Sequence, residues 1–107
     1  MVQMKAEELT NPVVRAMVTA MHNGDRKSFF ALFAPSAQLT DDGNPEPVTE
    51  WVDREIFRAH GSLYVESEDR DGLELTGRFE SDQWDMLTVW RFEVINERIQ
   101  RLDVAAV

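Results

Sequence analysis

Apolar residues recur at helical spacing in the first half of the chain. The valines and methionines between positions 14 and 21 lie at i, i+3, i+4 and i+7, which predicts a helix with one apolar face. Thr10 or Asn11 can cap this helix, and Pro12 suits its first position because proline lacks the N–H that would be unpaired there. Gly24 marks its expected end.

Two further helices are expected before the pattern changes. One runs from residue 25 to about residue 33, and the other occupies residues 48–60 with Thr49 as its N-cap. A short strand at residues 37–40 and a turn at residues 41–43 lie between these helices. The prolines at positions 45 and 47 are expected to prevent regular strand pairing there.

From residue 61 onward the period of the apolar residues falls from 3.6 to 2. Alternating segments at residues 63–68, 73–79, 84–95 and 98–104 are separated by turn sequences, which predicts an antiparallel meander. Helices followed by such a meander indicate an α+β fold. We therefore expect three N-terminal helices packed on one face of a curved antiparallel sheet.

Both faces of the predicted strand at residues 84–95 have apolar side chains. Trp90 and Phe92 belong to one face, and Leu87 and Val89 belong to the other. A sheet with one face in water would have polar residues on that side. This pattern predicts a homodimer that forms through the outer face of the sheet.

Length and composition limit the classes of function. The 107 residues make one domain, with a flexible N-terminus at residues 1–9 and the folded part at residues 10–107. The formal net charge of −9 disfavours nucleic acids and membrane surfaces as partners. The chain has no cysteine, and its two histidines lie far apart, so we expect no metal site and no cofactor. The cytoplasm is the expected location.

The order of these elements, together with several short motifs, resembles the nuclear transport factor 2-like superfamily. The most similar branch contains the SnoaL-like polyketide cyclases and ketosteroid isomerases. The resemblance covers about residues 10–104. It implies a cone-shaped roll with a cavity between the helices and the concave sheet and, usually, a dimer. The matching residues are Asn23-Gly24-Asp25, Ala31-Leu32-Phe33-Ala34, Ala37, Thr40-Asp41-Asp42-Gly43, Trp90-Arg91-Phe92 and Arg98-Ile99-Gln100-Arg101-Leu102.

The catalytic pattern of the ketosteroid isomerases transfers only in part. The resemblance places their general-base aspartate at Asp41, but their two oxyanion-hole residues fall on Met17 and Thr88. Enolisation requires donors where the oxyanion develops, so steroid isomerisation is not expected. The acid–base sets of the epoxide hydrolase and dehydratase branches are not recognisable either.

The candidate catalytic residue is Asp41, a general base if its carboxylate faces an apolar cavity. The alternative is that Asp41-Asp42-Gly43 is only a turn sequence. Large apolar and aromatic side chains are typical of ligand cavities, although the same residues also build ordinary cores. The candidate ligand-binding residues are Met17, Met21, Trp51, Met86, Thr88, Trp90 and Leu102.

Three functions remain open. The first is a homodimeric domain that binds an apolar small molecule in the cone. The second is a cofactor-independent isomerase, cyclase or lyase that uses Asp41, and the third is an interaction or accessory domain that acts through its sheet face. The small residues at positions 105–107 stand where the isomerase branch has aromatic cavity wall, which leaves the cavity wider or closed by the dimer partner.

Overall fold

The structure is a computed structural model and describes residues 3–107. The helix predicted from the valine and methionine spacing is α1 (Pro12–His22). Asn11 caps it, because its side chain accepts hydrogen bonds from the backbone N of Val13 at 2.9 Å and of Val14 at 3.2 Å. The apolar face of α1 is fully buried against the sheet, which confirms this part of the prediction.

Helix α2 (Arg26–Ala31) ends earlier than predicted, and strand β1 (Phe33–Asp41) begins almost at once. The strand predicted at residues 37–40 is therefore longer in the structure, and it includes Pro35. The structure accommodates this proline where the pairing of β1 shifts register, between Phe33 and Gln38.

The third helix also differs from the prediction. Helix α3 (Val48–Val52) follows Pro47, so Thr49 is not its N-cap. It continues as a π-helical turn over Asp53–Phe57, in which the N of Arg58 donates to the carbonyl oxygen of Asp53 at 2.8 Å. Arg26 of α2 binds the Asp53 carboxylate with two hydrogen bonds of 2.6 and 2.9 Å. These bonds favour the ionised carboxylate, so they lower the pKa of Asp53 and join α2 to this turn.

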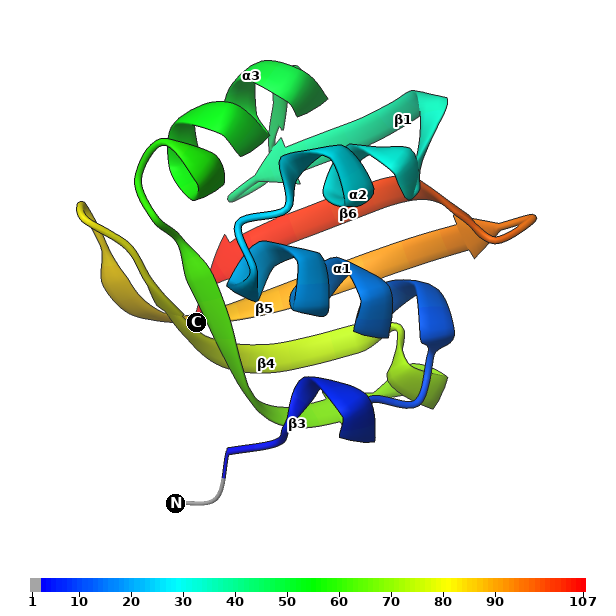
Figure 1. The fold of residues 1–107 in the computed structure, drawn as a ribbon, viewed down its shortest axis with the longest axis horizontal. Coiled ribbons are helices and arrows are strands. Elements are labelled where there is room, and N and C mark those ends of the chain that lie inside the picture. Colours follow the sequence, from blue (N-terminus) through cyan, green and yellow to red (C-terminus); the bar gives the residue numbers. More distant parts are fainter. Residues whose placement is uncertain (1–2) are drawn as a thin grey trace.

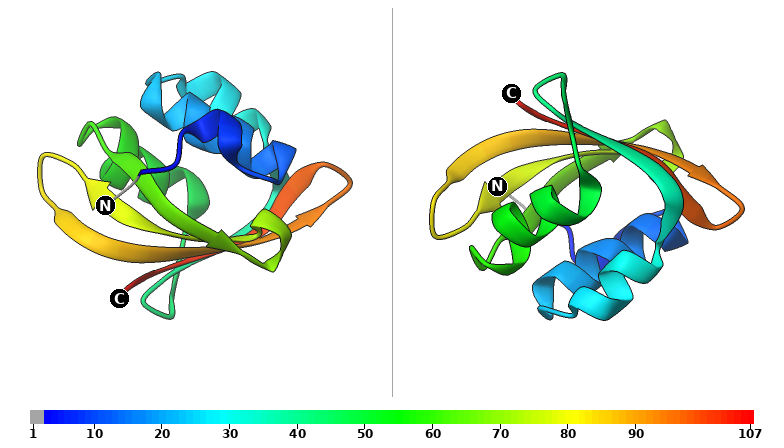
Figure 2. Two further views of the ribbon diagram at one scale, coloured as in Figure 1. Left: turned by 90° about the horizontal axis from the view of Figure 1, so that it is seen from below. Right: turned by 90° about the horizontal axis from the view of Figure 1, so that it is seen from above.

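All three α-helices cover one face of a curved sheet, and the other face is left open, as the two views of Figure 2 show. The strand order is β2-β1-β6-β5-β4-β3 (Figure 1). This arrangement confirms the α+β prediction, but the sheet is mixed because β1 runs parallel to β6. The remaining strands are β2 (Asn44–Glu46), β3 (Ser62–Asp69), β4 (Glu74–Glu80), β5 (Asp85–Ile95) and β6 (Arg98–Ala106).

The prediction that the prolines prevent pairing after the first turn is wrong. Asp42 and Gly43 have φ values of 50° and 85°, which suit the type I′ turn of a tight hairpin. The turn pairs β2 with the end of β1, so that Pro45 lies opposite Thr40. A proline is tolerated here because β2 is an edge strand and its missing N–H removes no bond inside the sheet.

Residues 4–9, which belong to the segment 1–9 expected to be flexible, contact the domain at two points. The backbone N of Met4 donates to the carbonyl oxygen of Val65 at 2.8 Å, beside strand β3. A 3₁₀ turn over Ala6–Glu8 then delivers Leu9, which is only 1% exposed, to the core. Burial of this apolar side chain opposes fraying of the segment. Residues 1–2 lie outside the described part.

The core fills the space between the helices and the concave face of the sheet. Trp90 on β5 is its largest fully buried side chain and lies between Thr88 and Phe92, which are also buried. In residues 3–107, no helix has both the length and the apolar character needed to cross a bilayer.

Candidate functional site

A pocket of about 170 Å³ opens at one end of the core. It lies where the β1–β2 turn, α3 with its π-helical turn, and the adjoining ends of β4, β5 and β6 meet. Aromatic and apolar side chains predominate in its walls, with acidic groups among them. The lining residues are Asp41, Asp42, Trp51, Glu55, Phe79, Trp84, Met86, Thr88, Trp90, Val104, Ala105 and Ala106.

Asp41 is the last residue of β1 and lines this pocket. Residues two apart on a strand face the same side, so Asp41 follows the buried Leu39 toward the helices. The indole Nε1–H of Trp51 donates a hydrogen bond of 2.9 Å to its Oδ2. Trp51 comes from α3 and is 3% exposed, so the helix fixes the orientation of the carboxylate.

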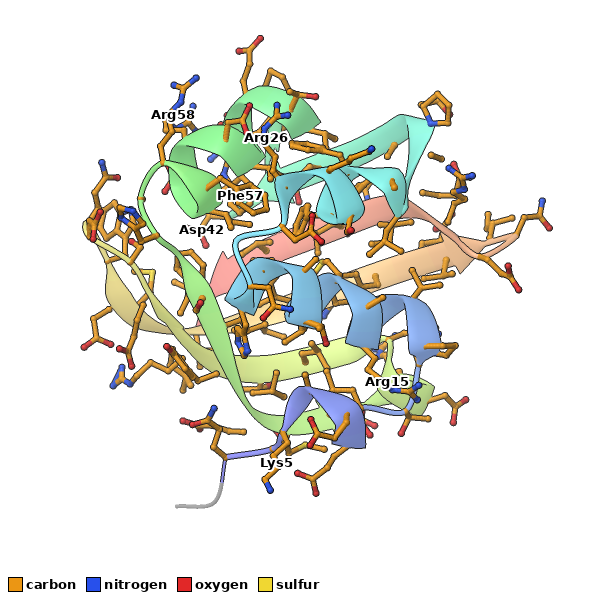
Figure 3. All side chains as sticks on the ribbon, in the orientation of Figure 1. Lys5, Arg15, Arg26, Asp42, Phe57 and Arg58 are labelled. Carbon is orange, nitrogen blue, oxygen red and sulfur yellow. The ribbon has the colours of Figure 1, made fainter. Side chains whose placement is uncertain are left out.

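Asp42 contributes a second carboxylate and also closes the turn. Its backbone N donates to the carbonyl oxygen of Val104 at 2.8 Å, and its Oδ1 accepts from the backbone N of Ala106 at 2.9 Å. These two bonds attach the turn to the end of β6. Figure 3 shows Asp42 at this end of β6, whereas Arg58 extends outward from the molecule.

Glu55 contributes the third carboxylate, from the π-helical turn. Its Oε1 accepts a hydrogen bond of 3.2 Å from the indole Nε1–H of Trp84. Its Oε2 accepts from Arg54 at 2.8 Å, and Arg54 also approaches Glu46 at 3.5 Å. Arg54 therefore partly neutralises the charge of Glu55, and it is shared with Glu46, which lies outside the pocket lining.

The inner wall of the pocket is formed by two residues of β5. The indole Nε1–H of Trp90 donates to the Oγ1 of Thr88 at 2.9 Å, and this hydroxyl donates in turn to the carbonyl oxygen of Gly77 at 2.9 Å. The ring of Trp90 packs edge-to-face on Trp51, with centroids 6.3 Å apart. Both the hydroxyl and the indole thus already have protein partners.

The structure brings together five of the sequence candidates and separates three. Asp41, Trp51, Met86, Thr88 and Trp90 line the same pocket. The other three, Met17, Met21 and Leu102, lie in the closed core with exposures of 0%, 2% and 0%. Met17 and Met21 face the sheet from α1, and the pocket forms beyond the reach of that helix.

Sequence reasoning did not select several pocket residues. Glu55 lies four positions after Trp51, a spacing that places two helical side chains on one face, so the signal was present. Trp84 directly precedes β5 and is 49% exposed. Its contact with Glu55 spans 29 positions of the chain, and no local pattern indicates such a contact.

Within residues 3–107, no group of three or more His, Asp or Glu side chains lies close enough together to hold a metal ion. No model of a protein family matches the sequence, and no curated protein matches it. Similarity is found only among solved structures.

Three of these similar structures are informative. A protein from Sinorhizobium meliloti described as a candidate polyketide cyclase has a TM-score of 0.75 at 18% identity, over 94% of this chain and 99% of that one. An NTF2-like protein of unknown function from Cytophaga hutchinsonii has a TM-score of 0.71 at 8% identity, over 99% and 93%. A computationally designed 17-OHP binder has a TM-score of 0.68 at 15% identity, over 86% of both chains. At these identities the comparison concerns the fold.

Proposed function

We propose that this chain, which has the nuclear transport factor 2-like fold, binds a small molecule with an apolar body in the pocket beside Asp41. The observation behind this proposal is the composition of the walls. Three tryptophans, a phenylalanine and a methionine surround about 170 Å³ at the end of the core. Ligand sites typically combine such apolar walls with a few polar groups in fixed positions.

The solved structures are consistent with this function. One is a designed 17-OHP binder, and another is described as a candidate polyketide cyclase. Both descriptions refer to small organic molecules that interact with a chain of this fold. The volume is similar to that of a cavity of about 150 Å³ that holds benzene, so a ligand with a single ring fits.

Tryptophan signals can test binding directly. The chain has only three tryptophans, and all three line the pocket. Titration with 2-phenylethanol, followed by the indole N–H signals in ¹H–¹⁵N spectra, is expected to show saturable shifts with a dissociation constant of about 1 mM or tighter. Absence of any saturable shift would contradict the proposal.

A blocked pocket provides the control for this titration. Ala106 lies opposite Thr88 in the sheet and lines the pocket, so the phenyl group in Ala106→Phe would occupy part of the binding volume. Binding is expected to weaken about tenfold or more. The same change at Ala16, an exposed residue of α1 outside the pocket, should leave the titration unchanged.

Catalysis by Asp41 is the second candidate, because its carboxylate lines the pocket and is oriented by Trp51. A carboxylate in such a position has the geometry of a general base. A carbonyl substrate, however, would also need a donor for its oxyanion. The indoles of Trp51 and Trp90 and the Thr88 hydroxyl already donate to protein acceptors, so binding without enolisation is the better-supported function.

We also propose that the outer face of the sheet binds a second copy of the chain. Leu87 and Val89 of β5 are half-buried on this face. The neighbouring strand β6 has the ion pair between Arg101 and Asp103, at 2.9 Å. Burial raises the pKa of Asp103, but the hydrogen bonds from Arg101 and Thr40 outweigh burial and lower it overall, so this carboxylate is ionised at neutral pH. A two-fold interface pairs the same surface on both copies, and a face with an apolar centre and charges of both signs offers the groups that such pairing needs.

Sedimentation at micromolar concentration is expected to give twice the mass of the chain. Val89→Arg should convert the protein to a monomer, because it places an unpaired charge at the centre of the apolar area. Ala16→Arg, on the helical layer, is the control and should remain dimeric. A monomeric wild type would contradict the dimer without affecting the pocket.

A further inference from the structure

Every side-chain donor in the pocket wall is already engaged. Trp51 donates to Asp41 at 2.9 Å, and Trp84 donates to Glu55 at 3.2 Å. Trp90 and the Thr88 hydroxyl form a chain that ends on a backbone carbonyl oxygen. A ligand that relies on accepting hydrogen bonds from these side chains would have to break existing ones, which is costly in a buried site.

The free hydrogen-bonding capacity of the pocket consists of acceptors. Asp41 accepts one hydrogen bond through Oδ2, and Asp42 accepts one through Oδ1. Within residues 3–107, the second carboxylate oxygen of each accepts no hydrogen bond. A carboxylate can accept about four, so a ligand that brings its own donors fits these sites.

The charge distribution points in the same direction. Three carboxylates line the pocket, and the described part of the chain places no lysine, arginine or histidine in its lining. The guanidinium of Arg54, outside the lining, is shared between Glu55 and Glu46. Neither Asp41 nor Asp42 forms an ion pair with a basic side chain of residues 3–107. An anionic ligand would therefore be repelled, and a cationic one attracted.

The aromatic walls also favour a positive charge. Trp51, Trp84 and Trp90 surround the same volume as the carboxylates. A cation near the face of an indole is attracted by the negative electrostatic potential of the ring, and tryptophan is the best of the aromatic residues for this contact. A pocket lined by both acidic groups and tryptophan rings is a suitable environment for an ammonium group attached to an apolar body.

We propose that the pocket binds a protonated amine with an apolar body about the size of one ring, with its ammonium group at Asp41 and Asp42. This inference rests on the proposed function and specifies the chemical class of its ligand. The body occupies the space between the tryptophans, and the ammonium group donates to the free carboxylate oxygens. A cation without donors would gain only part of this interaction.

Three probes of nearly equal size separate the charge from the apolar body. The cation is 2-phenylethylamine, the neutral probe is 2-phenylethanol, and the anion is phenylacetate. Titrations at pH 7, followed through the three indole N–H signals, should show that the amine binds about tenfold or more tightly than the alcohol. Phenylacetate should bind more weakly than the alcohol. The advantage of the amine should fall several-fold when the ionic strength rises from about 0.01 M to about 1 M.

Variants test whether these two carboxylates are responsible. Asp41→Asn and Asp42→Asn should each reduce the preference for the amine over the alcohol about threefold or more, and the double variant should abolish it. Asp42 has φ 50°, a conformation that asparagine tolerates. Asp71→Asn is the matched control, because Asp71 has a similar φ of 57° but lies outside the pocket lining, and it should retain the full preference.

The outcomes distinguish this inference from the proposed function. Equal affinity for all three probes would overturn the inference and leave the apolar binding pocket in place. Preference for phenylacetate would likewise overturn it. An amine preference that persists in the double variant would assign the attraction to the overall charge of −9 instead of to these residues, which also overturns the inference. Absence of indole shifts with every probe would overturn both proposals.

Discussion

Trp90→Ala is expected to lower the free energy of unfolding by about 3–5 kcal/mol. Trp90 is 1% exposed and is the largest fully buried side chain of the described chain. Its ring packs on Trp51 and on Phe79, with centroids 6.3 and 5.9 Å away. Truncation removes these contacts, leaves a cavity, and deprives the buried Thr88 hydroxyl of its donor.

Urea unfolding followed by far-UV circular dichroism measures this loss without relying on tryptophan emission. Trp84→Ala is the control, because this residue is also a pocket tryptophan but is 49% exposed. It should cost about 1 kcal/mol or less, since little apolar area is lost from the core. Equal losses in the two variants would show that Trp90 is not part of the core as described.

Gly77→Ala is expected to destabilise the domain by about 3 kcal/mol, although it adds only one methyl group. Gly77 lies on the inner face of β4, opposite Val65 on β3 and Thr88 on β5. A Cβ atom there would lie 2.5 Å from the carbonyl oxygen of Tyr64 and 2.9 Å from the Cα of Val65. Backbone atoms cannot move aside as a flexible side chain can, so the strands themselves must shift.

Thermal unfolding measures this effect, and Gly24→Ala provides the control. Gly24 has φ +65°, but no heavy atom lies within 4 Å of a Cβ placed there. This variant has only the conformational cost of a left-handed residue, about 1–2 kcal/mol. A Gly77→Ala variant as stable as Gly24→Ala would mean that β3 and β4 are not as closely packed as the structure has them.

Periodicity was sufficient to predict most of the fold. The 3.6-residue pattern around Met17 and the two-residue pattern from residue 61 onward identified the helical layer and the strands, because each element buries one face. The parallel pairing of β1 with β6 was not predicted. It joins Leu39 to Leu102, and a contact between such distant positions leaves no trace in a local pattern. The π-helical turn over residues 53–57 was not predicted either, because the spacing of its apolar residues resembles that of an α-helix.

The site was predictable to a smaller extent. Asp41 was selected from its place at the end of a strand, and its partner Trp51 was selected as an apolar wall. The hydrogen bond from the Trp51 indole to the Asp41 carboxylate was not predicted. It depends on how α3 lies over β1, and tertiary packing determines that arrangement. The close packing at Gly77 was not predicted, although a glycine inside an alternating strand pattern, here between Leu75 and Phe79, is a known local sign of close backbone approach.

The position of β6 between β1 and β5 has a consequence for the order of events during synthesis on the ribosome. The β1–β2 hairpin is among the first strands to be made, but its partner at residues 98–106 follows roughly sixty positions later. At about 5–20 residues per second, the inner edge of β1 stays unpaired for several seconds. Helix α1 can form early from local contacts, whereas the sheet is completed in one late step once β6 emerges. A nascent chain stalled before residue 98 would thus expose a strand edge to which chaperones or other unfinished copies could bind.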